Sequence, residues 1–385
     1  MNKSTGILFK IISLSVVTVF LVSAMLWMGC QRTVPTSAPE PESAQPVTTL
    51  SKANPLIQAV MRVQDLHTAE LMSYPDIIGT ATGLTPEGTP AILVFSKSKL
   101  DIVTKKAELE KGQPLPSSIE RIPVIVEYTG VIRPFKKPAP STSHTGIQTP
   151  PIQLGTSGGW RYDLANGYCC GGTLGSLIQI GGSKYILSNY HVFEADIVSG
   201  GNNKTATTGD YIIQPGLIDV NCNAANAQNV ATLVVKSSIP FNSNVDAAIA
   251  QIMPGMVQTD GSILEIGTIS SSTVSAYIGQ AVKKSGRTTG LTRSTVSALN
   301  ATISVAYEDE CAGGDAFTKT YTGQIVIANK RSKFLAGGDS GSLMVEDVAT
   351  NPHAIGLLFA GSTSTAIANP IDEVLDFMGA TMVGQ

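Results

Sequence analysis

The sequence predicts a mainly β fold that is preceded by a small α/β region. From Trp160 onward, short apolar runs alternate with clusters of Gly, Asn, Asp and Ser, a pattern typical of an all-β sandwich or barrel. Only 14% of the residues are charged, and the chain contains 37 Gly and 21 Pro. This composition favours turn-rich β structure over a helical bundle. Apolar residues make up 43%, which supports a folded core and excludes wholesale disorder.

The N-terminal segment has the features of an export signal. Residues 11–29 carry no charge and follow Lys3 and Lys10. We therefore expect 1–30 to be a signal or membrane-anchor segment that leaves the N-terminus in the cytoplasm. The run ends in LWMGC, which resembles the bacterial lipobox and makes Cys30 a candidate for lipidation, although Trp27 departs from that motif. Lipidation, an uncleaved anchor and ordinary secretion all place the body of the protein in the bacterial cell envelope or outside it.

The next part of the chain divides into a tether and a small domain. Residues 31–53 are rich in Pro, Ser and Thr and predict a flexible tether. Residues 54–135 predict a small α/β domain, since 55–72 has apolar residues near helical spacing. Strands are expected at 77–82, 90–96 and 122–130, and the charged stretch 97–111 could form a helix.

A second low-complexity linker is expected at 136–158, and it contains His144, which we expect to be solvent-exposed. The β region then extends over 159–385, with a single helix predicted at 371–378. Four His residues are dispersed along the chain, and no C-x-x-C pair is present. We therefore predict no metal and no organic cofactor. The net charge of −3 gives no indication of nucleic-acid binding.

Three motifs in the β region bring together the residue types that acyl transfer needs. They are LSNYHV at 187–192, VDAAIA at 245–250 and GGDSGS at 337–342. A serine nucleophile needs a base to accept its proton and a carboxylate to hold that base in the right tautomer. His191, Asp246 and Ser340 supply these groups. Glycine ahead of the serine allows the turn that aims backbone N–H groups at a developing oxyanion.

The order His, Asp, Ser and the G-D-S-G motif resemble the chymotrypsin-like (trypsin-like) serine peptidases. The resemblance implies a double antiparallel β-barrel, with His191 as general base, Asp246 as its orienting acid and Ser340 as nucleophile. It also implies an oxyanion hole made by the amides of Gly338 and Ser340. A bacterial group with a small N-terminal domain, related to the narrow-leaf proteins of plants, is similar over further segments. These segments are QPG at 214–216, DAAIA at 246–250, GRTTG at 286–290 and GLLFAG at 356–361.

The resemblance also predicts a substrate pocket. Phe334 falls at the pocket base, and Phe359, Ala360 and Gly361 at a wall. Phenylalanine at the base would shorten or close the pocket, which suggests small apolar substrate side chains. No Ile-Val-Gly-Gly start precedes the barrel, so Asp339 must find another cation or the site is preformed. Arg287 could pair with a buried acid such as Asp339.

Four cysteines besides Cys30 fit an exported domain. Two disulfides are plausible, in which Cys169 and Cys170 each bond to Cys222 or Cys311. Free buried thiols are the alternative.

The sequence thus predicts an envelope-anchored or secreted serine endopeptidase that acts on a peptide or protein substrate and contacts the membrane through its N-terminal anchor. A peptidase-fold binding module with little or no catalysis is the alternative. Esterase or transferase chemistry on the same triad is a third reading.

Overall fold

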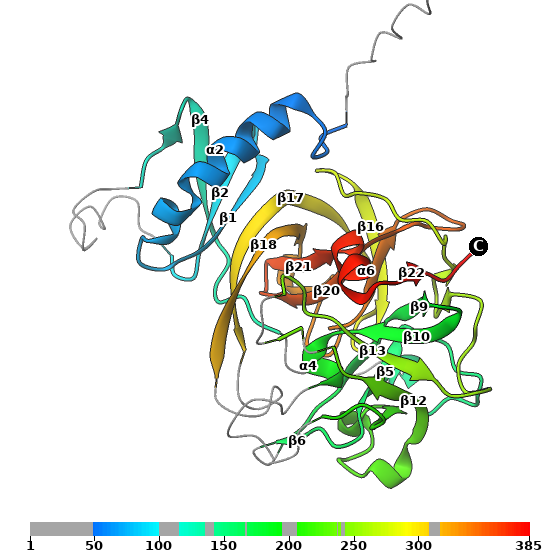
Figure 1. Cartoon of the computed structure of the whole chain (residues 1–385). Coiled ribbons are helices and arrows are strands. Elements are labelled where there is room, and N and C mark those ends of the chain that lie inside the picture. The colour runs from blue at the N-terminus through cyan, green and yellow to red at the C-terminus, as the bar shows by residue number, and fades with distance from the viewer. Residues whose placement is uncertain are drawn as a thin grey trace, which may run out of the picture. The chain divides into compact units, whose positions relative to one another are not determined.

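Two large β-sheets make up most of the described chain (Figure 1). The computed structural model describes residues 49–99, 115–134, 142–165, 168–194, 206–236, 238–239, 243–307 and 316–385. Residues 47–385 form one unit and residues 1–46 another. The predicted export segment, Cys30 and most of the tether therefore lie outside the described residues. Within the described residues, no helix is long and apolar enough to cross a membrane.

The larger sheet has ten strands, and most of its neighbours are antiparallel. Its strands, in spatial order, are β16 (Ala281–Gly286), β19 (Leu343–Glu346), β20 (Ala354–Gly361), β21 (Thr365–Pro370), β18 (Phe317–Ala328), β17 (Gly290–Tyr307), β1 (Ile77–Leu84), β2 (Pro90–Ser96), β4 (Ile122–Tyr128) and β3 (Ser118–Ile119).

The second sheet has eight strands. In spatial order they are β22 (Thr381–Met382), β9 (Ser176–Ile180), β10 (Ser183–Ser188), β13 (Ala248–Ile252), β12 (Gln228–Val234), β11 (Tyr211–Gln214), β5 (Thr156–Trp160) and β8 (Gly172–Leu174). Two short pairs complete the described strands, β14 (Ser262–Ile263) with β15 (Gly267–Thr268) and β6 (Leu164–Ala165) with β7 (Tyr168–Cys169).

The described helices are few and mostly short. They are α2 (Pro55–Met72), α3 (Thr142–Thr145), α4 (Tyr190–Phe193), α6 (Ile371–Met378) and the 3-10 turns η2 (Leu217–Asp219), η3 (Ala224–Asn226) and η4 (Lys330–Ser332). The mainly β fold predicted from the sequence is confirmed, and the two large sheets correspond to the double barrel that the resemblance implies. The helices predicted at 55–72 and 371–378 are also confirmed. Of the stretch 97–111, residues 97–99 are not helical, and the rest lies outside the described residues.

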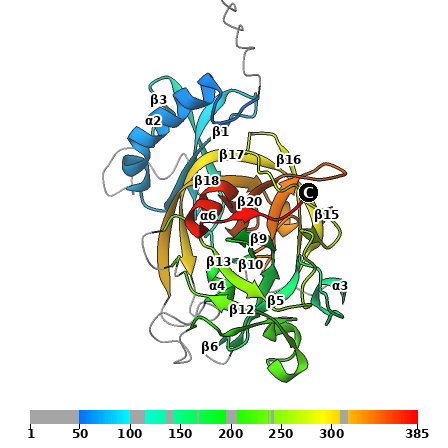
Figure 2. The same ribbon diagram turned by 45° about the vertical axis from the view of Figure 1, so that its right-hand side comes forward.

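Helix α2 begins where its sequence supplies a cap. The Asn54 side chain accepts a hydrogen bond from the Leu56 amide at 2.9 Å, and Pro55 occupies the first turn. The helix packs on β1 and β2, as Figures 1 and 2 show. Its residues Val60, Val63 and Leu71 are buried in a cluster with apolar residues of these strands. Burial of these residues stabilises a helix that would be marginal alone.

Strand β1 joins the small N-terminal region to the long strand β17. Gly79 lies opposite Ile303, and a Cβ atom on Gly79 would stand 2.6 Å from the Ile303 side chain and 2.8 Å from the Thr302 carbonyl. Only glycine therefore allows this close pairing. The ten-stranded sheet runs without interruption from the predicted 54–135 region into the C-terminal barrel. Whether 54–135 and 136–158 are separate units, as the sequence suggests, stays a prediction.

The described part of the 136–158 segment corrects one expectation. His144 is only 1% exposed, whereas the sequence predicted a solvated residue. Its Nε2 lies 3.0 Å from Ser285 Oγ and 3.1 Å from Glu265 Oε2. Burial lowers the pKa of His144, and the nearby Glu265 carboxylate opposes that shift. The low-complexity composition did not reveal these partners, because they lie far away in the sequence.

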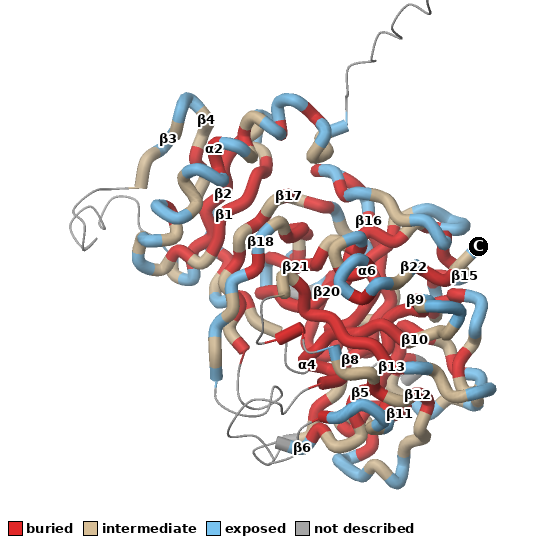
Figure 3. The backbone as a smooth tube through the Cα atoms, viewed as in Figure 1, coloured by how far each residue is buried: buried red, intermediate tan, exposed pale blue. Residues whose placement is uncertain are grey.

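The interior concentrates where the two sheets meet. Strand β20 is buried along its whole length, and the second half of β10 and the start of β13 are buried as well (Figure 3). Ser188, the last residue of β10, pairs with Ala248, the first residue of β13. His191 follows β10 and Asp246 precedes β13, so both lie near the same end of two neighbouring strands of one sheet. Ser340 precedes β19 of the other sheet.

Gln64 of α2 is fully buried and links the helix to two strands. It donates to the Asn300 carbonyl at 2.8 Å and accepts from Thr82 Oγ1 at 2.7 Å. We expect Gln64→Leu to lower the free energy of unfolding by about 2–4 kcal/mol, because two buried polar groups lose their partner. Urea unfolding measures this loss. Gln58→Leu, on the exposed side of the same helix, is the control, and equal losses in the two variants would contradict the linking role.

Candidate active site

His191 and Asp246 form a short, buried contact. His191 lies in α4, directly after β10, and its Nδ1 is 2.7 Å from Asp246 Oδ2. Asp246 is fully buried and His191 is 9% exposed. Two asparagines fix the backbone around the acid: Asn189 Nδ2 donates to the Asp246 carbonyl at 2.6 Å, and the Asp246 amide donates to Asn369 Oδ1 at 2.9 Å. An imidazole that donates a hydrogen bond from its Nδ1–H to a carboxylate keeps Nε2 available as a base.

Ser340 lies in a tight turn that both sheets hold in place. Its carbonyl accepts from the Thr173 amide at 2.9 Å, and the Thr173 carbonyl accepts from Ser188 Oγ at 2.8 Å. Gly341 has a φ of +91°, and a Cβ atom there would meet Ser188 Oγ at 2.3 Å, so glycine is required. These contacts bring the nucleophile motif against the end of β10, beside the His191 motif.

The Ser340 hydroxyl points to a carbonyl in this structure. Ser340 Oγ donates to the Phe359 carbonyl at 3.5 Å, and no hydrogen bond joins it to the His191 ring among the described residues. Catalytic hydrogen bonds of free enzymes are often long and tighten only when substrate is bound.

Two backbone amides beside the serine have no partner in the described part of the chain. The amides of Asp339 and Gly341 donate to the carbonyls of Ala336 and Leu358, both at 3.0 Å, whereas those of Gly338 and Ser340 donate to none. The carbonyls of Gly337 and Gly338 accept from Thr288 Oγ1 at 2.5 Å and Thr173 Oγ1 at 2.9 Å, which fixes the peptide planes. Free, fixed amides are what an oxyanion hole requires.

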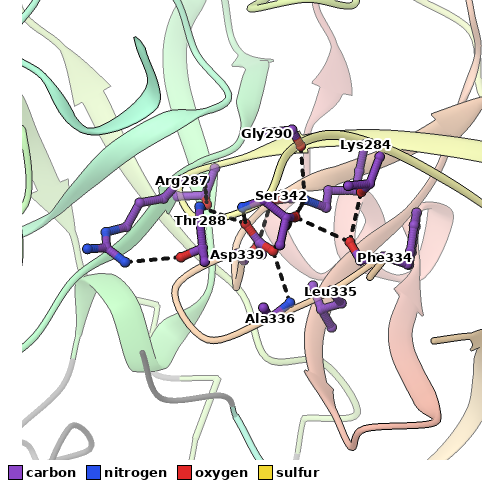
Figure 4. Close-up of polar contacts among 12 residues, drawn as sticks. Lys284, Arg287, Thr288, Gly290, Phe334, Leu335, Ala336, Asp339 and Ser342 are labelled. Atoms are coloured by element: carbon purple, nitrogen blue, oxygen red, sulfur yellow. Dashed lines mark hydrogen bonds and ion pairs between the residues drawn. The ribbon is translucent and has the colours of Figure 1, made fainter. Parts of the chain in front are cut away.

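The acid that precedes the nucleophile is paired with a buried lysine (Figure 4). Lys284 Nζ lies 3.3 Å from Asp339 Oδ2, and both side chains are fully buried. Lys284 also donates to the Gly290 carbonyl at 3.0 Å and to Thr289 Oγ1. Burial lowers the pKa of Lys284, and the Asp339 carboxylate opposes that shift. Asp339 thus has the internal cation that the missing Ile-Val-Gly-Gly start made necessary.

Backbone donors complete the environment of Asp339. Its Oδ1 accepts from the amides of Thr288 at 2.9 Å and Thr289 at 3.1 Å. Its Oδ2 accepts from Thr289 Oγ1 at 2.7 Å and from the Ala336 amide at 3.0 Å. Because every one of these donors is fixed in the β16–β17 turn or the 336–339 turn, the carboxylate holds the two turns together.

Arg287 is not the partner of Asp339, which corrects the pairing that the sequence suggested. Its guanidinium binds Asp219 of η2 in a bidentate pair, with Nε–Oδ2 at 2.6 Å and Nη2–Oδ1 at 2.5 Å. In Figure 4 the Arg287 side chain points away from Asp339. The sequence missed Lys284 because a second cation, Arg287, stands three residues away, and only the tertiary fold decides which of these two buried cations meets Asp339. The strand that holds Lys284 reads AVKKSG, with two adjacent lysines, so no local signal singled this lysine out.

The predicted pocket residues are all buried beside the nucleophile turn. Phe334 is 2% exposed and packs in an apolar cluster with Leu335 and Leu358, while Phe359 packs on Tyr321 with ring centroids 4.9 Å apart. Ala360 and Gly361 follow in β20 and are buried as well.

Asn329 joins the predicted base of the pocket to the loop after its wall. Its Oδ1 accepts from the amides of Phe334 and Leu335, both at 3.0 Å. Its Nδ2 donates to the carbonyls of Leu335 at 2.9 Å and Ser362 at 2.8 Å. No sequence pattern indicated this residue, whose role depends on contacts between loops.

One of the two disulfide pairings left open by the sequence is present. Cys169 bonds to Cys222, 53 residues away. Cys170 is also disulfide-bonded, and Cys311 lies outside the described residues. Across the ranges that the structure describes, no group of three or more His, Cys, Asp or Glu side chains could hold a metal ion.

The fold is similar to that of chymotrypsin-like serine proteases, as the sequence resemblance implies. Comparison with known proteins agrees with this class. The family described as the Nal1 C-terminal domain matches residues 220–369. The chain is 29% identical over 168 residues to glutamyl endopeptidase 2 of Streptomyces griseus, across 43% of this chain and 80% of that protein. It is 33% identical over 113 residues to serine protease 1 of Streptomyces fradiae, across 29% of this chain and 28% of that protein.

Among solved structures, Thermobifida fusca protease A aligns with 61% of this chain and 99% of its own, at 18% identity and a TM-score of 0.39. A glutamic acid specific serine protease aligns with 60% of this chain and 100% of its own, at 21% identity and a TM-score of 0.38. The two Streptomyces relatives confirm the sequence resemblance to bacterial serine peptidases, and the Nal1 C-terminal domain match fits the relation to the narrow-leaf proteins of plants.

We expect Lys284→Met to lower the free energy of unfolding by about 3–5 kcal/mol, because it leaves the Asp339 carboxylate buried without a counter-charge. Urea unfolding measures the loss. Lys97→Met is the matched control, since Lys97 lies at the same 3.3 Å from Asp76 but on the surface, where we expect about 0–1 kcal/mol. The double variant Lys284→Met/Asp339→Asn should recover part of the loss. Equal, small losses in Lys284→Met and Lys97→Met would contradict this account.

Proposed function

We propose that the protein is a serine endopeptidase that hydrolyses peptide bonds through an acyl-enzyme on Ser340. The observation that carries the proposal is the buried 2.7 Å contact between His191 and Asp246, beside a serine turn with two free amides. Ser340 Oγ turns from the Phe359 carbonyl toward His191 and attacks the substrate carbonyl, and His191 Nε2 accepts its proton. Asp246 stabilises the imidazolium that forms.

The remaining steps use the same groups. The tetrahedral oxyanion accepts hydrogen bonds from the Gly338 and Ser340 amides. His191 then returns its proton to the leaving amine, so the peptide bond breaks and an ester to Ser340 remains. A water molecule, deprotonated by His191, hydrolyses that ester and regenerates the serine. The Lys284–Asp339 pair supports a site that is formed without insertion of a new N-terminus.

The substrate preference we propose is for small apolar side chains. The Streptomyces griseus relative is named a glutamyl endopeptidase, which raises the possibility of cleavage after glutamate. The residues expected at the pocket here are Phe334, Phe359, Ala360 and Gly361, none of which carries a positive charge to bind a carboxylate. A peptide library therefore should favour Ala or Val over Glu before the cleaved bond.

We also propose that residues 1–30 deliver the protein to the bacterial cell envelope and that Cys30 carries the lipid anchor. The lipobox-like segment ahead of Cys30 supports this, as does the long tether that follows. Secretion without a lipid and retention of a helical anchor are the alternatives.

A second candidate function has one observation in its favour. Ser340 Oγ contacts the Phe359 carbonyl and not His191, as expected for a peptidase-fold binding module with weak or no catalysis. Esterase or transferase chemistry would use the same triad as proteolysis, and substrate screening separates these reactions.

Labelling with a fluorophosphonate probe tests the catalytic proposal, because the probe bonds only to a serine whose base and oxyanion hole are assembled. The purified full chain should label, Ser340→Ala should not, and Ser271→Ala, which removes an exposed hydroxyl, should label as the wild type does. Folded wild-type protein that fails to label would overturn the endopeptidase proposal and favour the binding module.

A further inference from the structure

The Asp246 carboxylate has a second side-chain donor besides His191. Tyr307, the last residue of β17, donates from Oη to Asp246 Oδ2 at 2.7 Å. The same oxygen accepts from His191 Nδ1, also at 2.7 Å. Tyr307 is 2% exposed, and its ring meets the His191 ring edge-on with centroids 6.1 Å apart. Since the contact of Asp246 Oδ1 with the His191 amide is long, at 3.4 Å, Tyr307 is the firm second restraint on the carboxylate.

A second tyrosine fixes the direction of the Tyr307 proton. Tyr321 of β18 lies with its Oη 2.6 Å from Tyr307 Oη. The only hydroxyl proton of Tyr307 goes to Asp246, so Tyr321 must be the donor between the two tyrosines. Burial, together with the negative charge of Asp246, raises the pKa of both tyrosines well above the usual value, which keeps both hydroxyls protonated. The result is a directed chain from Tyr321 through Tyr307 to Asp246.

Aromatic packing holds this chain in place. The Tyr307 ring stacks on Phe317 with centroids 4.9 Å apart, and the Tyr321 ring packs on Phe359 at 4.9 Å. The Phe359 carbonyl is the acceptor for Ser340 Oγ, so the same cluster also contacts the nucleophile.

One lysine faces the cluster from β18. Lys319 Nζ lies 5.0 Å from the centre of the Tyr321 ring and donates to the Ser238 carbonyl at 3.1 Å. Burial lowers the pKa of Lys319, and the charge of Asp246 opposes that shift. The groups that face the acid are therefore His191, Tyr307, Tyr321 and this lysine, and only the first two bond to its carboxylate within the described residues.

We propose that Tyr307 is a positioning residue for the catalytic acid, and that Tyr321 acts through it. The inference rests on the proposed endopeptidase function and adds to the triad a hydroxyl pair that no sequence motif indicated. The Tyr307 hydroxyl holds Asp246 Oδ2 next to the His191 ring, and its hydrogen bond stabilises the negative charge of the carboxylate. Without it, the carboxylate has one side-chain donor and more freedom to rotate, so the base is held less well at the angle that proton transfer needs.

Steady-state kinetics of three full-length variants test the inference. Tyr307→Phe keeps the ring and removes the hydroxyl, and we expect kcat to fall about 10- to 100-fold with little change in KM. Tyr321→Phe should lower kcat by a smaller factor, because Tyr307 still reaches Asp246. Tyr211→Phe, at an exposed tyrosine of β11, is the control and should leave both constants unchanged.

Two further readouts separate positioning from a merely structural effect. The acidic limb of the pH–rate profile should move to higher pH in Tyr307→Phe, because a carboxylate that has lost a donor attracts the imidazolium more strongly. In proton NMR of the same full chain, the downfield signal of the His191 Nδ1 proton should shift in Tyr307→Phe and hardly change in Tyr211→Phe. This signal needs no turnover, so it tests the contact even if the chain proves inactive.

A failure of the positioning role can be told apart from a failure of the proposed endopeptidase function. Wild-type protein that shows neither labelling nor turnover contradicts the endopeptidase, whatever the tyrosines do. The positioning role is overturned if the wild type is active and Tyr307→Phe has an unchanged kcat, pH profile and NMR signal. Should Tyr307→Phe fail to fold, Tyr321→Phe provides the test, since it leaves the acid's own partners in place: an unchanged kcat and NMR signal in that variant overturns the inference.

Discussion

The buried pair of Lys284 and Asp339 is the interaction on which the site depends. Asp339 stands between Gly338 and Ser340, whose amides bond to no group in the described part of the chain, and its carboxylate accepts hydrogen bonds from four donors in two turns. A buried carboxylate without a counter-charge is strongly unfavourable, and the Lys284 ammonium supplies that counter-charge from within the fold. The turn that presents the serine and its amides is therefore held by the fold itself, and no chain end needs to enter.

The site is assembled from both sheets, so its geometry depends on how they are joined. His191 follows β10 and Asp246 precedes β13, two neighbouring strands of the eight-stranded sheet, whereas Ser340 precedes a strand of the ten-stranded sheet. The Arg287–Asp219 pair joins the β16–β17 turn to η2, and Thr173 bonds to Ser340 from the opposite sheet. Tyr307 adds a contact from the end of β17 to the acid. We expect a change at any of these links to alter the distance between His191 and Ser340.

Local features of this chain could be predicted from the sequence, and long-range pairings could not. The helix at 55–72 follows from its apolar spacing, and the motifs around His191, Asp246 and Ser340 indicate a triad, which stays a prediction. The partner of Asp339 could not be chosen, because Lys284 and Arg287 are both buried and only the tertiary fold decides which carboxylate each one meets. His144 and Tyr307 also gave no local signal, since their partners, Glu265 and Asp246, are brought to them by the tertiary fold.

A crystal structure of the full chain after reaction with phenylmethylsulfonyl fluoride tests the central claim most directly, namely that the oxyanion hole is preformed around Asp339. The account predicts a sulfonyl oxygen bonded to the amides of Gly338 and Ser340. It also predicts that Lys284 and Asp339 remain paired, with the 336–341 turn unchanged from the unreacted protein. A Gly338 amide turned away from the adduct, or an Asp339 side chain released from Lys284, would contradict it.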